Sequence, residues 1–235
     1  MNLQTSLLIT SLGFFIFSCN TNCIEGNGRP GSESRDLPVF TKIELGGAYN
    51  LVLTQDSATQ SLMIHADENL LPYIKTEVRD GALRVYSDDN ICDDVKIAIA
   101  MNELTNLDVS GAVEVEMTNR FSTQEFQLEA SGAVEATLDV EAEKINTSIS
   151  GAGEIGYRGE AGRHDVRVSG AGELKAFDLV TGIYDIRVSG AAECGIHVLN
   201  ELHVNASGAS SVLYKGNPTV IKEDVSGASS IKKAD

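Results

Sequence analysis

The chain has 235 residues, of which 34 are acidic and 18 are basic, so its formal net charge is -16. A charge of this sign repels polyanions and argues against nucleic acid as a partner. The chain has no Trp and only 6% aromatic residues, which leaves few rings on which bases or sugars could stack.

Residues 1–19 are predicted to be a lipoprotein-type signal peptide ending at Cys19. The apolar run over residues 7–17 is shorter than the roughly 20 residues that a membrane-spanning helix needs. The small Ser18 before Cys19 resembles the lipobox of bacterial lipoproteins, in which the cysteine carries the lipid. The first six residues contain no Lys or Arg, so a plain secretory signal is the alternative.

Residues 20–36 are rich in Asn, Gly, Ser and Glu and are predicted to be a flexible tether. Residues 37–103 are predicted to form N-terminal coils and a cap, with a hairpin turn at Asp80-Gly81 and a helical turn within 67–73. A separate small domain is the alternative for this region. The predicted strands cover residues 40–45, 49–54, 61–66, 76–78, 83–86 and 95–101.

Residues 104–235 repeat the tripeptide Ser-Gly-Ala seven times, at intervals of 18 to 21 residues. A period near twenty in segments rich in Val, Ile and Leu is typical of a solenoid, in which each repeat buries its apolar face against its neighbours. We therefore predict an all-β fold, a single-chain parallel β-helix, right-handed, with coils of about 19–20 residues. The seven serines are Ser110, Ser131, Ser150, Ser169, Ser189, Ser207 and Ser226.

Alignment of the repeats on these serines predicts which side chains face inward. Apolar residues recur one and three positions before the serine and five and seven positions after it. The change of parity places a corner at Ser-Gly-Ala, where the glycine permits a bend and the small alanine is predicted to fill a tight inner corner. Segments such as 156–162 and 216–218 are predicted to be turns between coils.

The four cysteines do not by themselves indicate a disulfide framework. Cys194 occupies an inward column as a small apolar residue. Cys23 and Cys92 could pair in an oxidising compartment, but nothing in the sequence brings them together.

Several segments in order resemble the bacterial GIN-domain family, which is labelled an auto-transporter adhesin head domain. The resemblance starts near residue 39, runs to the C-terminus, and implies a parallel β-helix on the envelope of Bacteroidota-type bacteria, without catalytic residues. The segments are Cys23-Ile24-Glu25-Gly26-Asn27-Gly28, Phe40-Thr41-Lys42-Ile43-Glu44-Leu45, Tyr49-Asn50-Leu51-Val52-Leu53-Thr54-Gln55, Asp67-Glu68-Asn69-Leu70-Leu71, Gly81-Ala82-Leu83-Arg84-Val85 and the repeated Val-Ser-Gly-Ala-Gly-Glu.

A column of glutamates four positions after the serine is the first candidate site. In-register stacking would place these carboxylates about 4.8 Å apart, where they repel one another and where bound Ca²⁺ would relieve the repulsion. The alternative is that the side chains splay into water, and no other cofactor is expected. The members are Glu114, Glu135, Glu154, Glu173 and Glu193, followed by Ser211 and Ser230.

A polar patch on neighbouring coils is the second candidate site. Asp165 and Arg167 recur one coil later as Asp185 and Arg187, and His203 and Asn205 hold the same places in the next coil. The pattern resembles the charged clusters of β-helical polysaccharide lyases, and its alternative is a network of ion pairs that offsets stacked like charges. The serine column and the four histidines show neither triad nor ligand spacing.

The sequence therefore predicts a non-catalytic, lipid-anchored envelope protein that presents a rigid acidic β-helix for adhesion or ligand binding. A carbohydrate-active protein that uses the polar patch and a structural homo-oligomeric scaffold are the alternatives. The expected partners are a protein or glycan ligand and, through the lipid anchor alone, a membrane. The expected location is the outer membrane, on its periplasmic face or at the cell surface.

Overall fold

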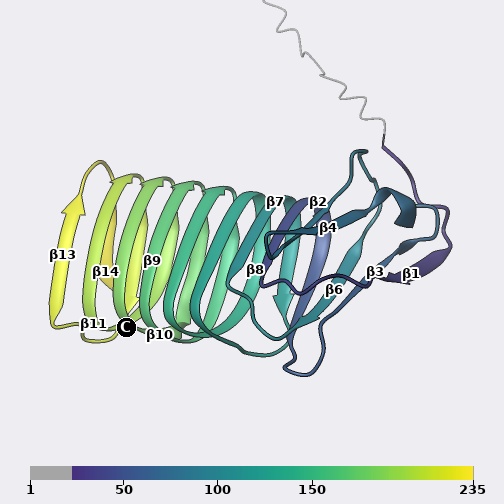
Figure 1. Cartoon of the computed structure of the whole chain (residues 1–235). Coiled ribbons are helices and arrows are strands. Elements are labelled where there is room, and N and C mark those ends of the chain that lie inside the picture. Colours follow the sequence, from purple (N-terminus) through teal and green to yellow (C-terminus); the bar gives the residue numbers. More distant parts are fainter. Residues whose placement is uncertain (1–22, 235) are drawn as a thin grey trace, which may run out of the picture.

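The computed structural model describes residues 23–234, and the predicted signal peptide with Cys19 lies outside them. The described chain winds one 14-stranded sheet into a parallel β-helix, with an irregular cap at the N-terminal end (Figure 1). Within 23–234 the helical structure is a single 3₁₀ turn, η1 (Leu71–Tyr73). The predicted all-β solenoid is confirmed.

The regular stack begins after the cap and runs to the last described coil. Successive coils pair in parallel, and each corner serine lies in register with the serine of the coil beside it, as Ser150, Ser169 and Ser189 do. The strands are β7 (Asn106–Met117), β8 (Phe121–Gly151), β9 (Glu154–Gly170), β10 (Glu173–Gly190), β11 (Glu193–Gly208), β12 (Ser211–Lys215), β13 (Val220–Val225) and β14 (Ser230–Lys233).

The predicted inward columns form the core. In the coil of β9, for example, Ile155, Tyr157, Val166 and Val168 are buried, and the charged side chains between them face outward. Each fully buried aliphatic side chain contributes roughly 1.5–3 kcal/mol to stability. Stacking repeats the same contact in every coil, so one apolar core runs from Phe40 to Val212.

The Ser-Gly-Ala corners are confirmed, but the predicted place of the alanine is wrong. The seven corner glycines have φ between +75° and +112°, a conformation that other residues rarely adopt. This bend turns both the glycine and the alanine outward, so alanines such as Ala112 and Ala133 are exposed. The inward column resumes one residue later, at Val113 and Val134.

The prediction of a turn over residues 156–162 is also wrong, because that segment continues within β9. The alternation of buried and exposed residues shifts instead after Gly162, which is exposed between buried Ala161 and the outward Arg163. A second outward corner therefore lies opposite the first along the coil. Residues 216–218 leave the sheet, as predicted.

The cap is continuous with the stack. Residues Gly46, Gly47 and Ala48 of β2 lie in register with the Ser-Gly-Ala corner of β7, so β2 is itself a coil and a separate domain is not observed. Asp80 and Gly81 form the predicted hairpin turn, both with positive φ. The cap strands are β1 (Pro30–Ser34), β2 (Lys42–Gln55), β3 (Ser61–Asp67), β4 (Lys75–Arg79), β5 (Ala82–Tyr86) and β6 (Lys96–Met101).

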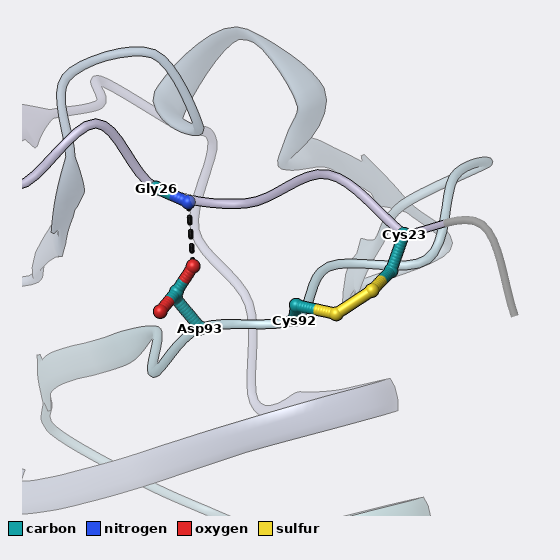
Figure 2. The surroundings of a disulfide bond; sticks show 4 residues. All are labelled: Cys23, Gly26, Cys92 and Asp93. Carbon is teal, nitrogen blue, oxygen red and sulfur yellow. Dashed lines mark hydrogen bonds between the residues drawn. A yellow bond between two sulfur atoms is a disulfide. The ribbon is translucent and has the colours of Figure 1, made fainter.

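The segment predicted to be a tether is instead built into the cap from Cys23 onward. Strand β1 pairs antiparallel with β3, and a disulfide joins Cys23 to Cys92 with their Cα atoms 5.5 Å apart (Figure 2). Beside the disulfide, the backbone N–H of Gly26 donates to the Asp93 carboxylate at 2.5 Å. Polar composition suggested a loose segment, whereas long-range pairing supplies the partners that order it.

The last described coil ends the stack with charge. Glu223 occupies the inward column of β13 and is exposed, and Lys222 and Lys232 lie on the two final strands. Because no further described coil covers this edge, Ile221 and Val225 are 42% and 40% exposed. Charged residues on an open edge discourage pairing with other chains.

Candidate functional site

The glutamate column stacks in register, as predicted. The pairing of β7 to β11 places each glutamate from Glu114 to Glu193 beside the next, with Asn50 before them and Ser211 after them. Their side chains point outward from the face that follows each Ser-Gly-Ala corner.

A lysine that the sequence analysis did not single out neutralises part of this column. The Lys175 ammonium contacts the Glu154 carboxylate and lies 3.6 Å from that of Glu173. Lys175 is two positions after Glu173, on the same face, so the repeat alignment contained the signal. Within residues 23–234, no three His, Cys, Asp or Glu side chains converge as a metal centre would require.

The polar patch is brought together, but its two aspartates are engaged in ion pairs. Asp165 and Asp185 lie side by side on β9 and β10. The Arg163 guanidinium binds Asp165 at 2.7 Å and reaches Asp185 at 3.4 Å, and Lys144 approaches Asp165 at 3.9 Å. The hydrogen bond to Asp165 also raises the pKa of Arg163. Neither aspartate is left as an unpaired acid or base.

Arg163 was not predicted from the sequence because it lies at the second corner, six positions before Ser169, where the apolar pattern gives no signal.

The other two residues of the predicted patch, His203 and Asn205, also have polar neighbours. His203 Nε2 lies 3.6 Å from the Glu201 carboxylate, and the Asn205 amide donates to Asp224 at 3.4 Å.

The residues two positions before each corner form a column on the outer surface, which we call the outer column. Strand pairings link its members from β2 to β13, and the step from Glu129 to Ser148, both on β8, follows from the stacking of Gly151 on Gly132 three positions later. Its charge can therefore be followed along the stack. Three acids come first, then a serine, two arginines, an asparagine and one acid. The members are Glu44, Asp108, Glu129, Ser148, Arg167, Arg187, Asn205 and Asp224.

Stacking of like charges is visible at the acidic end of this column. Burial raises the pKa of Asp108, and the neighbouring carboxylates of Glu129 and Glu44 raise it further. Arg167 and Arg187 likewise place two like charges, here positive, in register on neighbouring coils. Arg187 has Asp185 at 3.2 Å, whereas Arg167 makes no ion pair with any carboxylate in the described part of the chain.

These two arginines border a hollow of about 340 Å³, which we call the arginine groove. Ser148 and Asn205 of the outer column and the corner serines Ser169 and Ser189 also line it. The groove thus combines two guanidinium groups with hydroxyl and amide groups over the coils of β8 to β11.

His164 is enclosed in the core and is not part of this surface. His164 is fully buried in the core, where its Nε2 shares a hydrogen bond of 2.8 Å with the Thr147 hydroxyl, which also bonds Tyr157 at 2.8 Å. Burial lowers the pKa of His164 to about 3 and raises that of Tyr157. A neutral, enclosed imidazole stabilises the core and cannot reach a ligand from solution.

The free thiol of Cys194 is equally enclosed. It lies in an inward column, as predicted, and burial raises its pKa to about 12. A thiol in this state is a poor nucleophile.

Among residues 23–234, we found no helix with the length and apolar character that a membrane span requires.

Fold and surface define the class of this protein: a β-solenoid whose surface residues form in-register columns. Within that class, the chain belongs to the family described as "putative auto-transporter adhesin, head GIN domain", whose model matches residues 39–218. No curated protein matched the sequence.

Solved structures share the fold at low sequence identity. One is described as a putative adhesin from Bacteroides fragilis, with 22% identity and a TM-score of 0.84 over 90% of this chain and 100% of that one. Another is described as a putative lipid binding protein from Parabacteroides distasonis, with 23% identity and a TM-score of 0.74 over 91% and 100% of the two chains. A putative adhesin from Parabacteroides merdae has 21% identity and a TM-score of 0.67 over 90% and 99%.

Proposed function

We propose that this chain is a non-catalytic lipoprotein of a bacterial cell envelope, which presents its β-helix for adhesion or for binding a ligand. The observation that carries the proposal is the continuous register of the outward columns, which displays polar and charged groups at regular steps along the surface of the stack. The family description and the names of the similar structures support it.

The disulfide supports the location outside the cytoplasm. Disulfides such as Cys23–Cys92 persist in oxidising compartments and are rare in the cytosol. With Cys19 as the lipid anchor, only three residues would separate the lipid from the disulfide, so the cap would lie close to the membrane. The cap, rather than a tether, would then hold the stack at the membrane.

The lipid anchor is tested by labelling cells that produce the whole chain with an alkyne-bearing fatty acid. The wild-type chain is expected to take up label and to fractionate with membranes, and Cys19→Ala to do neither. If the cleaved chain is secreted without lipid, the plain secretory signal is correct. If the chain is lipid-anchored, protease treatment of intact cells distinguishes a chain exposed at the cell surface from one on the periplasmic face.

Adhesion is tested by comparing a strain that lacks the gene with the same strain complemented by the whole chain. Binding to mucin-coated and matrix-coated surfaces is expected to fall in the deletion strain and to return on complementation. Equal binding by the two strains to every surface would contradict the proposal. Light scattering on the purified chain tests the alternative of a homo-oligomeric scaffold, which predicts a mass above that of one chain.

The carbohydrate-active alternative would need an acid or base free to act on a sugar. In the polar patch the carboxylates of Asp165 and Asp185 are both bound by Arg163. This arrangement favours the alternative in which the patch is a network of ion pairs. We therefore propose binding without catalysis at this surface.

A further inference from the structure

We propose that the arginine groove binds an acidic sugar residue within an otherwise neutral glycan. The inference deepens the proposed function by naming a ligand class and a surface, and it rests on that proposal for its biological role.

The two guanidinium groups of the groove belong to Arg167 and Arg187, which lie in register on neighbouring coils. Residues stacked in this way lie about 4.8 Å apart. Arg167 has no carboxylate partner among residues 23–234, although the chain has nearly twice as many acidic as basic side chains. The nearby Asp165 carboxylate is bound by Arg163, and the Asp185 carboxylate is shared between Arg163 and Arg187, so Arg187 is partly paired and Arg167 is not. An oxyanion from a ligand would relieve the repulsion and accept paired N–H donors.

Beyond the two arginines, the outer column changes from positive to neutral and then to negative charge. On each side one neutral residue comes first, Ser148 and Asn205, and an acidic residue follows it, Glu129 and Asp224. A carboxylate two coils from an arginine lies roughly 10 Å away, so a ligand that extends this far along the column brings its own end charges beside Glu129 and Asp224, within the Debye length of about 8 Å at physiological salt. A ligand with negative charges along its whole length would be repelled at both ends. The column therefore selects a single anionic group flanked by neutral ones.

The groove lining also includes the hydroxyls of Ser169 and Ser189 and the amide of Asn205. Hydroxyl and amide groups are the donors and acceptors that sugar hydroxyls use. The hollow of about 340 Å³ is open at the surface and lies within the size range of small-molecule sites, so it can hold an acidic sugar residue while the neighbouring sugars extend along the stack. The chemistry thus fits a uronic acid, a sialic acid or a sulfated sugar.

The test measures binding of the full chain to pairs of oligosaccharides that differ in one uronic, sialic or sulfate group. We expect binding to at least one acidic member, weaker binding to its neutral counterpart, and weakening by added NaCl. Arg167→Gln and Arg187→Gln should each reduce the affinity by about tenfold or more, as loss of a charged hydrogen bond does. Arg29→Gln is the matched control, because Arg29 is an exposed arginine of the cap, and it should bind as the wild type does.

Three outcomes would overturn the inference. The first is that the wild-type chain binds no acidic oligosaccharide of the set. The second is that both groove variants bind as tightly as the wild type does. The third is that inorganic sulfate or phosphate binds as tightly as the acidic sugars, which would reduce the groove to a simple anion site. Circular dichroism of each variant would show that it is folded.

The closing experiment separates this inference from the proposed function. The deletion strain is complemented with the chain that carries Arg167→Gln and Arg187→Gln. If wild-type complementation restores adhesion and the double variant restores it equally, the groove is not the adhesive surface while the proposed function stands. If neither complements but the purified chain binds acidic sugars in the predicted manner, the site stands and the adhesive role does not.

Discussion

The cap and the stack solve the same problem of burying an apolar face in different ways. In the stack every coil covers the next with identical columns, so each contact is repeated in register. Apart from the coil of β2, the cap has no such repeat and depends on antiparallel pairing of β1 with β3, a hairpin and one disulfide. Many equivalent contacts therefore hold the stack together, whereas a few contacts that occur once hold the cap.

Removal of the disulfide is the largest expected effect and should break the cap alone. Cys23→Ser with Cys92→Ser opens a crosslink between positions 69 residues apart, and the loop-entropy model gives a loss of about 4 kcal/mol. Hydrogen exchange is expected to rise in β1, which the disulfide holds near β3, and to stay slow in β9. Uniformly faster exchange in both strands would show that cap and stack unfold together.

A substitution at a corner should break the stack. In Gly170→Ala the new Cβ would lie 2.6 Å from the carbonyl oxygen of Gly151 in the preceding coil, at a φ of +109°. Collision and backbone strain together should cost about 3 kcal/mol in the free energy of unfolding. The cap supplies the control, since Gly81→Ala has positive φ and nothing within 4 Å, and should cost about 1 kcal/mol. Equal losses in denaturant titrations would contradict the close approach of the coils.

The core of the stack should respond to pH through His164. Its folded pKa is about 3, below the ordinary 6.5, so between these values the unfolded chain binds a proton that the folded chain does not. Its contribution to stability therefore falls as pH is lowered from 6.5 toward 3, by up to about 1.4 kcal/mol per pH unit. Urea titrations of His164→Leu should show a shallower pH dependence than the wild type. Replacement of exposed His65 by Leu is the control, and an unchanged slope in His164→Leu would contradict the assignment.

The smallest effect is expected on the glutamate column. Lys175→Gln removes the cation beside Glu154 and Glu173, all three of which are about half exposed, so the melting temperature should fall by no more than about 2 °C in low salt. The difference should vanish in 1 M NaCl, where exposed charges are screened, roughly as the Debye length implies. Millimolar Ca²⁺ should leave the wild-type melting temperature unchanged, and a clear rise would restore the calcium hypothesis.

The candidate sites could be predicted only in part. Alignment on the corner serines correctly stacked the five glutamates and brought Asp165 beside Asp185. It did not reveal that Arg163 binds both aspartates, because which charged neighbour reaches across a coil depends on side-chain direction at the second corner. Arg167, on which the arginine groove depends, has no carboxylate partner because Arg163 binds the nearby aspartates. The sequence alone did not reveal this.

The architecture of the stack, its register and its inward columns could be predicted from the repeat alone. A repeat makes each residue the neighbour of its own equivalent, so a local pattern already specifies the contacts between coils. The closure of the cap, the outward direction of the corner alanines and the place of the hollow depend instead on long-range contacts in the folded chain. These features arise where the repeat fails or bends, and there contacts between distant or turned residues, such as Cys23 with Cys92, cannot be read from periodicity.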